Sequence, residues 1–470
     1  MASSNTNNNT NTTNPEKEKK SSAPPLKITE WRFSEFLGEK IPLVNFKTNP
    51  ENESFLVTNC KFSNTGDHQV ITDKGGRIII FKKKEKKSSG APKLEYYYEY
   101  PAHDKDFDVH KSVEYSEEIK SLSIFPVTDY NKLDLITASY RNIHIDRIYQ
   151  KSYKVFEKID DSLLNNNNNV YIPKVKQSKV EVKNKSILKL SSAHTAEINS
   201  VSINNCNVDN FISSDEGKLY LWDINNTKEI YNVVSLDTSD ETSEKITTSV
   251  YSPYHSSLFA YGTNKGNIKL CDIRINSQTT KSITNFKDEN SNLNKTIFAN
   301  QLLSVHDINF KLSNDYLFAT RHYLSVNLWD QRKNNEPLFK FMLYEPIINK
   351  LSYLYQNEYF KDKFSLCNDP EGKFILTGGY NNMFHVIDIG QRLNSQIVLD
   401  DTNEKSLNTN IIRKVNSKGS CFYKKDEPDM SAFSFDKKVT SVALSPVENF
   451  SMLACLNCIF TYHGSLSKSK

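Results

Sequence analysis

Few residues of this chain have the spacing that catalysis or metal binding needs. Cys455 and Cys458 form a CxxC pair, but neither a second such pair nor a histidine pair lies nearby, as a zinc site would need. Two glycine pairs, in 73–76 (DKGG) and at 378–379, are reminiscent of phosphate loops. Such loops open a helix, whereas these pairs lie in predicted turns between strands, so we interpret them as hairpin glycines with positive φ.

Other catalytic signatures are missing from the sequence as well. It has no P-loop, no GxSxG elbow and no HExxH motif, and its 10 histidines are dispersed rather than clustered. We therefore expect a protein that is not an enzyme, with no catalytic residue, no cofactor and no metal. Catalysis stays an alternative hypothesis.

Local charge is the remaining feature that could act on other molecules. Residues 104–118 contain six acidic side chains, which would attract basic segments of a partner. Residues 150–190 contain nine lysines and four acidic residues, and we expect this insertion to project and hold another protein. The alternatives are an ordinary solvated loop for the first stretch and a surface loop without a partner for the second.

Composition narrows the class of protein. The 60 basic and 56 acidic residues leave a net charge of only +4, so bulk charge does not indicate nucleic acid or a membrane surface as partner. The 24 Tyr and 26 Phe favour strands. Seven scattered cysteines indicate reduced thiols, and there is no apolar run of membrane length and no signal-like N-terminus. We predict a cytoplasmic protein, with the nucleus as a second location.

A repeated unit must position these side chains. Each copy reads as an apolar strand, a polar turn, a second strand, a tight turn, and a third strand ending in an apolar or aromatic residue and often Asp. The clearest copy is 193–223, which ends in Trp222-Asp223. Including this copy, the sequence contains seven units: 56–81, 119–146, 193–223, 248–272, 305–330, 364–388 and 439–464.

Seven such units predict an all-β fold, a seven-bladed WD-repeat β-propeller over residues 30–464. Residues 30–36 are expected to supply the outermost strand of the last blade and so close the ring. Residues 1–29 are predicted to be a disordered tail, 465–470 a short C-terminal tail, and the five asparagines 165–169 part of a loop. The Trp-Asp pairs are interpreted as structural.

Several longer runs resemble one known family. They are TDKGGRIIIF (72–81), FDVHKSVEYSEEI (107–119), AHTAEINSVSIN (193–204), NKGNIKLCDIR (264–274), RHYLSVNLWD (321–330), KLSYLYQNEYFKDKF (350–364) and GGYNNMFHVID (378–388). In this order they are similar to signature stretches of the 55 kDa regulatory B subunits of protein phosphatase 2A.

The resemblance implies a heterotrimer with a HEAT-repeat scaffold A subunit and a metal-dependent Ser/Thr phosphatase catalytic C subunit. This chain would select phosphoprotein substrates, and the insertion 150–190 would grip the scaffold. The family's substrate groove, which takes basic segments, would be lined here by the matching residues Glu53, Lys74, Glu114, Glu216, Glu345 and Lys350.

The chain departs from the family pattern at a few groove positions. Glu216 stands where aspartate is expected, which keeps the charge, and Ser116 replaces an expected acid. Ala196 and Glu197 replace an aromatic residue and a histidine, which puts in question whether the same substrates bind equally well. The alternative function is a generic WD-repeat interaction scaffold, such as a ubiquitin-ligase adaptor. Loss of the phosphatase scaffold on deletion of 150–190 would discriminate between the two.

Overall fold

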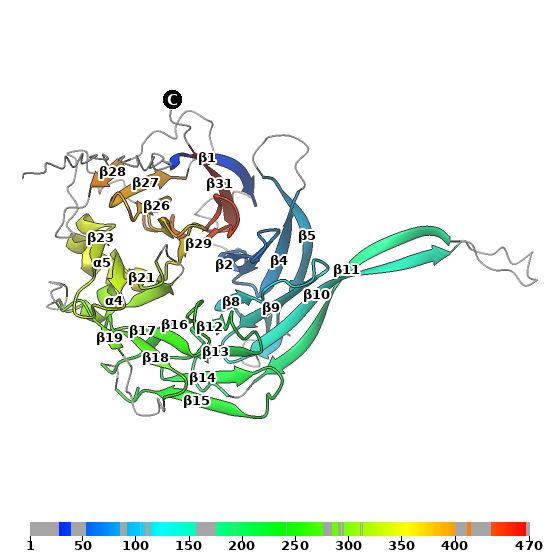
Figure 1. Ribbon diagram of the computed structural model, residues 1–470, viewed down its shortest axis with the longest axis horizontal. Helices are drawn as coiled ribbons and strands as arrows, with labels where there is room; N and C mark the ends of the chain where they lie inside the picture. Colours follow the sequence, from blue (N-terminus) through cyan, green and yellow to red (C-terminus); the bar gives the residue numbers. More distant parts are fainter. Residues whose placement is uncertain are drawn as a thin grey trace, which may run out of the picture.

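Seven antiparallel sheets stand around a ring in the computed structural model (Figure 1), which confirms the predicted seven-bladed β-propeller. The structure describes residues 28–38, 53–84, 92–103, 105–108, 113–156, 175–191, 193–240, 242–275, 284–289, 293, 296–310, 312, 314–399, 411–414 and 434–466. Most of the predicted N-terminal tail, the asparagine run 165–169 and the end of the C-terminal tail lie outside these residues.

Each of the first four blades consists of four consecutive strands, the first innermost and the fourth outermost. Blade 1 contains β2 (Val57–Phe62), β3 (His68–Asp73), β4 (Arg77–Lys83) and β5 (Leu94–Pro101). Blade 2 contains β8 (Ser121–Ile124), β9 (Lys132–Ala138), β10 (Ile143–Phe156) and β11 (Val175–Leu190). Blade 3 contains β12 (Ser200–Ile203), β13 (Asn210–Ser214), β14 (Lys218–Asp223) and β15 (Ile230–Ser235). Blade 4 contains β16 (Ile246–Tyr251), β17 (Leu258–Thr263), β18 (Ile268–Asp272) and β19 (Thr284–Phe286).

The remaining blades follow the same order, with additions. Blade 5 contains β20 (Val305–Asn309), β21 (Leu317–His322), β22 (Ser325–Asp330) and β23 (Phe339–Met342). Blade 6 contains β24 (Leu366–Asn368), β25 (Phe374–Gly378), β26 (Met383–Asp388), β27 (Leu393–Val398) and a fifth strand, β28 (Ile411–Lys414). Blade 7 contains β29 (Val439–Leu444), β30 (Phe450–Cys455), β31 (Cys458–Leu466) and β1 (Ile28–Leu37). All seven predicted units coincide with the first three strands of a blade.

Links between blades carry a few short extra elements. A small hairpin of β6 (Asp106–Asp108) and β7 (Val113–Tyr115) lies between blades 1 and 2. Helix α4 (Ala299–Leu303) precedes blade 5, and η2 (Glu345–Lys350), α5 (Leu351–Gln356) and η3 (Tyr359–Lys361) join blades 5 and 6. No helix in the described part of the chain is long and apolar enough to cross a membrane.

The ring is closed by its N-terminal strand. β1 pairs antiparallel with β31, so the outermost strand of blade 7 comes from the opposite end of the chain, as predicted. Trp31 is buried in the core between blades 6 and 7, and the ring of Phe33 meets that of Tyr462 edge-on at 5.8 Å. The strand begins at Ile28, so the last two residues of the predicted tail belong to it.

The hydrophobic core lies between the blades rather than at the centre of the ring. Seven clusters of buried apolar side chains each combine residues from two neighbouring blades, and one of them joins blade 7 to blade 1. The pattern follows from strand periodicity, because alternate residues of a strand point to opposite faces of its sheet. Each blade therefore buries both faces only when it has a neighbour on each side, which is why the ring must close.

Polar side chains link the inner strands around the central channel. The backbone N–H of Cys60 donates to Ser441 Oγ across blades 1 and 7, and that of Ser249 donates to Ser200 Oγ across blades 3 and 4. Equivalent side chain to backbone bonds occur at the other junctions through Asn59, Ser121, Thr247, Asp307 and Ser365. These bonds satisfy groups that an inner strand cannot pair within its own sheet.

The residues of the Trp-Asp pairs are structural, as predicted. The buried indole N–H of Trp222 donates to Ser213 Oγ at 2.7 Å. The same hydroxyl lies 2.6 Å from His194 Nε2, and His194 Nδ1 lies 2.9 Å from Asp215. Asp223 accepts a bond from the backbone N–H of Asn225 and so holds the turn after the third strand. These side chains are satisfied inside blade 3.

One interpretation of the glycines was wrong. Gly76 has φ +77°, as expected for a hairpin glycine, but Gly378 and Gly379 have no positive φ. A β-carbon at Gly378 would collide with the backbone oxygen of Val439, and one at Gly379 with the hydroxyl of Tyr344. The left-handed positions of that turn are taken by Asn381 and Asn382 instead. The glycine pair serves close packing between blades.

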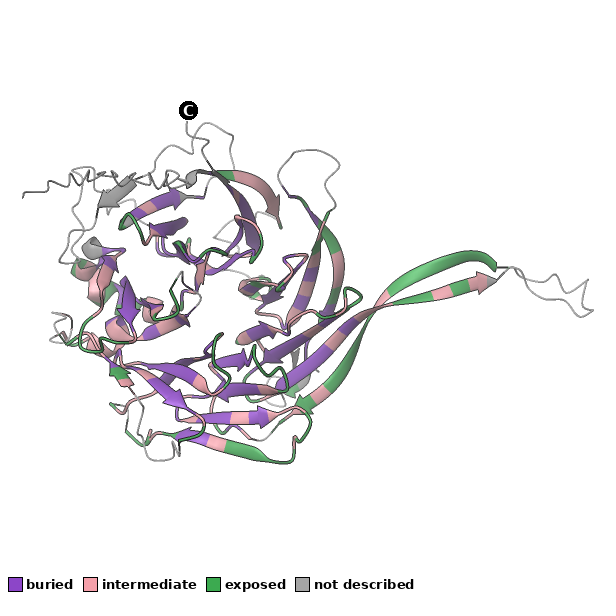
Figure 2. Cartoon of the chain, in the orientation of Figure 1, coloured by how far each residue is buried: buried purple, intermediate pink, exposed green. Residues whose placement is uncertain are grey.

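A projecting ribbon is formed by described residues of the insertion 150–190, as predicted, while 183–190 belong to the outermost strand of blade 2. β10 pairs with β9 only over Ile143–Tyr149, whereas its pairing with β11 continues to Phe156. We call the part beyond the blade, Gln150–Phe156 with Val175–Val182, the arm. Figure 1 shows it extending from the ring, and Figure 2 shows that most of its residues are exposed.

Candidate functional site

The six predicted groove residues lie at one end of the ring. In an antiparallel blade, the turn between the second and third strands and the link to the next blade leave the sheet at the same end. Backbone bonds join the two kinds of connection, for example Gly75 N–H to Ser54 O at 2.7 Å and Ile246 N–H to Glu216 O at 2.8 Å. We call this end the connection face. All six residues are located in these turns and links: Glu53, Lys74, Glu114, Glu216, Glu345 and Lys350.

Two of these residues form one pair above blade 1. Lys74 Nζ lies 2.8 Å from Glu53 Oε2, and both side chains are about half exposed. Beside them the guanidinium of Arg77 lies over the ring of Phe55 at 5.1 Å and bonds to Asp73. The glycine turn 73–76 positions Lys74 because it reverses the chain between β3 and β4. This corner offers an apolar ring surrounded by both charges.

Glu216 belongs to a second charged group over blades 2 to 4. It pairs with Lys245 at 2.8 Å, while Lys120 pairs with both Glu118 and Glu197 at 2.8 Å. Burial alone would lower the pKa of Lys120, but the two carboxylates outweigh it and raise the pKa, so the ammonium stays charged. Glu197, at a departure from the family pattern, is therefore part of this ion-pair network.

Lys363 completes that group from the far side of the ring. It immediately precedes blade 6, yet its Nζ donates to Asn199 Oδ1 of blade 3 at 3.2 Å. It also lies within the electrostatic reach of Glu197, Glu216 and Lys120. Lys363 is not among the predicted site residues, although it lies in the signature run 350–364. Lys363 is the last charged residue before the inner strand β24, and this position could have indicated a site residue.

For Glu114, Glu345 and Lys350 the structure gives the position in the chain and the element that contains them. Glu114 lies in β7, and Glu345 begins η2, but the side chains of both lie outside the described residues. Lys350 ends η2, in the link that leads to α5. The structure thus joins Glu53 to Lys74 and groups Glu216 with Glu197, whereas Glu114, Glu345 and Lys350 share only the face with them. The role of all six residues in substrate binding stays a prediction.

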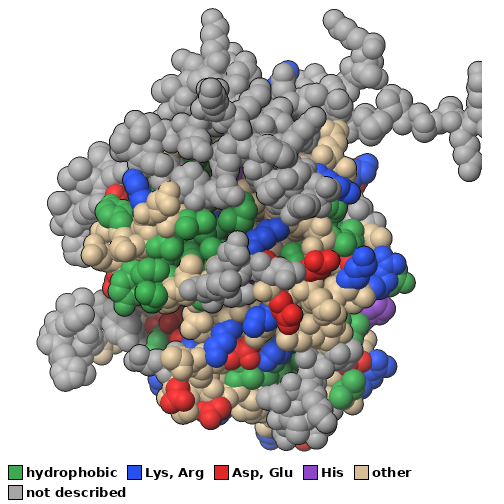
Figure 3. All heavy atoms as spheres, turned by 90° about the vertical axis from the view of Figure 1, so that its left-hand side faces the viewer, with side chains coloured by type: hydrophobic (Ala, Val, Ile, Leu, Met, Phe, Trp, Pro, Cys, Tyr) green, Lys and Arg blue, Asp and Glu red, His purple; other side chains and the backbone are tan. Residues whose placement is uncertain are grey.

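An apolar patch lies at the same end of the ring, in two links between blades, and sequence reasoning missed it. Phe298 packs at 5.5 Å from both Tyr355 and Phe360. Ile297 is 96% exposed and Tyr355 61% exposed, so the patch is open to a partner. Figure 3 shows hydrophobic side chains gathered on the side of the molecule that bears α4 and α5. The pattern could not be read from the sequence because two separate links build it.

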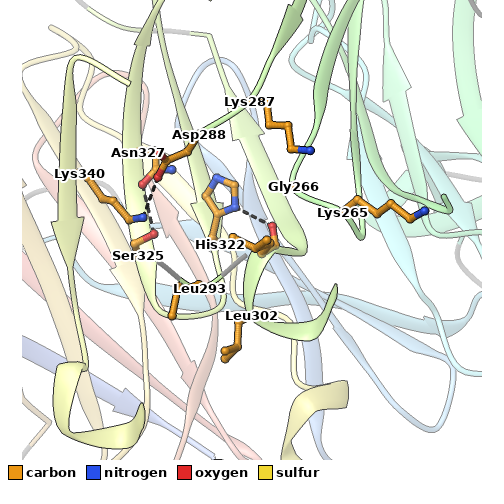
Figure 4. A pocket seen from close by; sticks show the side chains of 11 residues that line it. Lys265, Gly266, Lys287, Asp288, Leu293, Leu302, His322, Ser325, Asn327 and Lys340 are labelled. Atoms are coloured by element: carbon orange, nitrogen blue, oxygen red, sulfur yellow. Dashed lines mark hydrogen bonds and ion pairs between the residues drawn. The ribbon is translucent and has the colours of Figure 1, made fainter. Parts of the chain in front are cut away.

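A small pocket lies between blades 4 and 5 (Figure 4). Lys340 Nζ lies 2.7 Å from Asp288 Oδ2, and the buried His322 is bonded through Nδ1 to the carbonyl of Leu303 at 2.8 Å. In Figure 4 the side chain of Lys265 points away from His322. Since these polar groups are paired within the protein, we assign the pocket no ligand.

The described part of the chain contains neither a cluster of metal ligands nor a reactive pair of thiols. No three His, Cys, Asp or Glu side chains there gather closely enough to hold a metal ion. Cys455 and Cys458 lie opposite each other across the β30–β31 turn as buried thiols, and burial raises the pKa of Cys455 to about 12. A thiol with so high a pKa is a poor nucleophile and metal ligand.

A comparison with models of known protein families finds no match for this chain. The fold is that of a β-propeller, which typically serves as a protein-interaction scaffold. Its connection face combines ion-pair networks with an open apolar patch, and an exposed arm projects from blade 2.

Proposed function

We propose that this chain is a non-catalytic regulatory B subunit of a protein phosphatase 2A heterotrimer. Its arm binds the HEAT-repeat scaffold, and its connection face captures basic segments of phosphoprotein substrates. The metal ions and the reacting groups belong to the catalytic subunit. The proposal combines the resemblance of the runs between 72 and 388 with the geometry of the propeller.

The observation that carries the proposal is the arm. The hydrogen-bonded ladder between β10 and β11 runs for seven residues of β10 beyond the last residue that pairs with β9, from Gln150 to Phe156. A blade needs no such extension, and the arm interrupts blade 2, where the resemblance expects the scaffold-binding hairpin. Its side chains are largely exposed, so they are available to a partner.

The connection face supports the substrate-binding half of the proposal. Glu53, Glu197 and Glu216 each lie beside a lysine on this face, so it offers carboxylates at several points around the ring. The lysines and arginines of a substrate segment can replace those lysines as partners of the carboxylates. Salt screens such contacts. Binding scaffold and substrate together raises the concentration of the phosphosite near the catalytic subunit.

Excision of the arm tests the proposal. Residues 151–181 are replaced by an Asn-Gly turn, and the purified full chain and the variant are each mixed with the scaffold subunit. We expect the variant to lose scaffold binding and to keep the melting temperature of the propeller, since blade 2 retains all pairs between β9 and β10. Equal scaffold binding by both proteins, or none by the intact chain, would contradict the proposal.

A further inference from the structure

The register of the ribbon divides its side chains between two faces. Residues that pair across an antiparallel ribbon share a face, and alternate pairs change face. One face, which we call the blade face, carries the pairs Ile148 with Asn184 and Gln150 with Val182. The opposite face, which we call the lysine face, carries the pairs Arg147 with Lys185, Tyr149 with Lys183, Lys151 with Glu181 and Tyr153 with Lys179.

Blade 1 already occupies the base of the blade face. Ile148 is fully buried in the core between blades 1 and 2, and Val182 packs against the same cluster. The hydroxyl of Tyr98, from β5, donates to Asn184 Oδ1 at 3.1 Å. These contacts hold the ribbon against blade 1, so at its base only the lysine face is open to a partner.

The lysine face has an excess of positive charge. Four of the six lysines within 150–156 and 175–185 lie on this face, Lys151, Lys179, Lys183 and Lys185, together with the one acidic residue of these segments, Glu181. Glu181 lies 3.4 Å from Lys183 and accepts a bond from the hydroxyl of Tyr153 at 2.7 Å. Among the described residues, Lys151, Lys179 and Lys185 have no carboxylate within ion-pair distance, and all three are exposed.

Glu181 relieves only part of the repulsion between these ammonium groups, because one carboxylate lies among four lysines of the face. Lys183 and Lys185 are two residues apart on one strand, about 7 Å, and Lys179 lies beyond Glu181 on the same face. The spacing of about 7 Å is within a Debye length at physiological salt. A partner that presents carboxylates along a matching line would relieve the repulsion and gain attraction. A neutral or basic partner surface would gain neither.

We propose that the lysine face docks onto an acidic ridge of the scaffold subunit, so that charge complementarity selects the partner of the arm. The inference rests on the proposed function and adds the chemistry of the contact and the face that makes it. The blade face holds the arm in place, and the lysine face binds.

Charge reversal on the two faces provides the test. Lys179→Glu, Lys183→Glu and Lys185→Glu are combined in the full chain, because none of these lysines lies opposite a carboxylate in the ribbon. The control combines Lys154→Glu, on the other face of the arm, with Lys228→Glu and Lys333→Glu on blades 3 and 5, giving the same change in net charge. Affinity for the purified scaffold subunit is measured at low and high salt.

We expect the lysine-face variant to bind the scaffold roughly 10 to 100 times more weakly and the control to bind within about threefold of the unaltered chain. Binding by the unaltered chain should weaken by about tenfold at high salt. Tight binding that neither salt nor the lysine-face variant affects would overturn the inference and leave the proposed function intact. Absence of scaffold binding by the unaltered chain would overturn both.

A membrane is the competing partner for a basic ribbon. The same proteins are therefore sedimented with vesicles of phosphatidylcholine containing phosphatidylserine. Failure of the vesicles to bind the unaltered chain agrees with a protein partner. Vesicle binding that is lost in the lysine-face variant, while scaffold affinity is unchanged, would assign the face to anionic lipid and refute the inference.

Discussion

At the scale of single residues, Glu216 is the best placed of the predicted groove side chains. Its carboxylate lies 2.8 Å from Lys245 and faces the charges around Lys363. Substituting Glu216→Lys places a third cation among these lysines, so we expect a Lys- and Arg-rich phosphopeptide to bind about tenfold more weakly. Fluorescence anisotropy with the labelled peptide measures this change.

The matched control for that prediction is Glu371→Lys. Glu371 is an exposed residue in the turn between β24 and β25, at the end of the ring opposite the connection face, and it is also paired with a lysine. Equal loss of peptide binding in both variants would indicate a general charge effect, and the assignment of Glu216 to the groove would then be wrong. Scaffold binding should be unchanged in either variant.

His322 sets a pH dependence of stability. Burial lowers its pKa to about 4, against the partial opposition of the Leu303 carbonyl, so the imidazole is neutral in the folded protein. Unfolded, the group takes up a proton near pH 6.5. Stability should therefore fall by up to about 3 kcal/mol as the pH drops from 6.5 to 4.

The variant His322→Gln cannot take up that proton. We expect it to lose about 1 kcal/mol at neutral pH through a poorer hydrogen bond, but to lose less stability than the unaltered chain on acidification. Melting temperatures from pH 7 to 4 measure the two slopes. Parallel slopes would mean that His322 is not kept neutral by burial.

At the scale of elements, β1 stabilises the closure of the ring. It covers the edge of β31 and inserts Trp31 into the core between blades 6 and 7. Trp31→Ala should destabilise the protein by about 3 kcal/mol, which denaturant unfolding or thermal melting would detect. Arg32→Ala, at the next and exposed position of the same strand, should cost much less. Similar losses in both would show that the strand, rather than its buried side chain, is sensitive.

The links between blades show why some elements escaped prediction. The β6–β7 hairpin and the helices η2 and α5 lie in links between blades, for which the repeat pattern predicts no structure. They do not share the strand and turn order of the blades. The helical link is fixed by distant contacts instead. The hydroxyl of Tyr359 donates to Asp436 at 2.7 Å, and Lys438 pairs with Asp362.

At the scale of the whole molecule, the protein is expected to position other proteins without reacting itself. The purified chain should show no phosphatase turnover. Added to scaffold and catalytic subunits, it should lower the KM for a phosphopeptide with flanking lysines by about tenfold and leave p-nitrophenyl phosphate hydrolysis unchanged. The comparison needs only steady-state rates with the two substrates.

Two results would contradict that expectation. If the purified chain alone hydrolyses a substrate, and substitutions in the chain abolish that activity, the chain is an enzyme. An equal effect on the lysine-flanked peptide and on a peptide with neutral flanks would remove the role of the charged connection face. A generic interaction scaffold would bind neither phosphatase subunit.

The number and order of the blades could be predicted from the sequence alone, because strand alternation and turn residues are local signals that repeat in all seven units. Residues 30–36 could be predicted as the outermost strand of blade 7, because the free edge of that blade needs a strand to pair with. The arm was visible as an insertion longer than a blade requires. The blades and the arm depend only on neighbours along the chain, whereas that outermost strand follows from the rule that a closed ring leaves no strand edge unpaired.

The tertiary structure alone decided which charges meet. Lys363 reaches Asn199, 164 residues away, and Trp31 packs against blade 6, because ring closure brings distant segments together. The same closure explains why Gly378 is needed for contact with blade 7 rather than for a turn, and why Phe298 meets Tyr355. Such contacts depend on the spacing between blades, a long-range property that no local pattern of residues encodes.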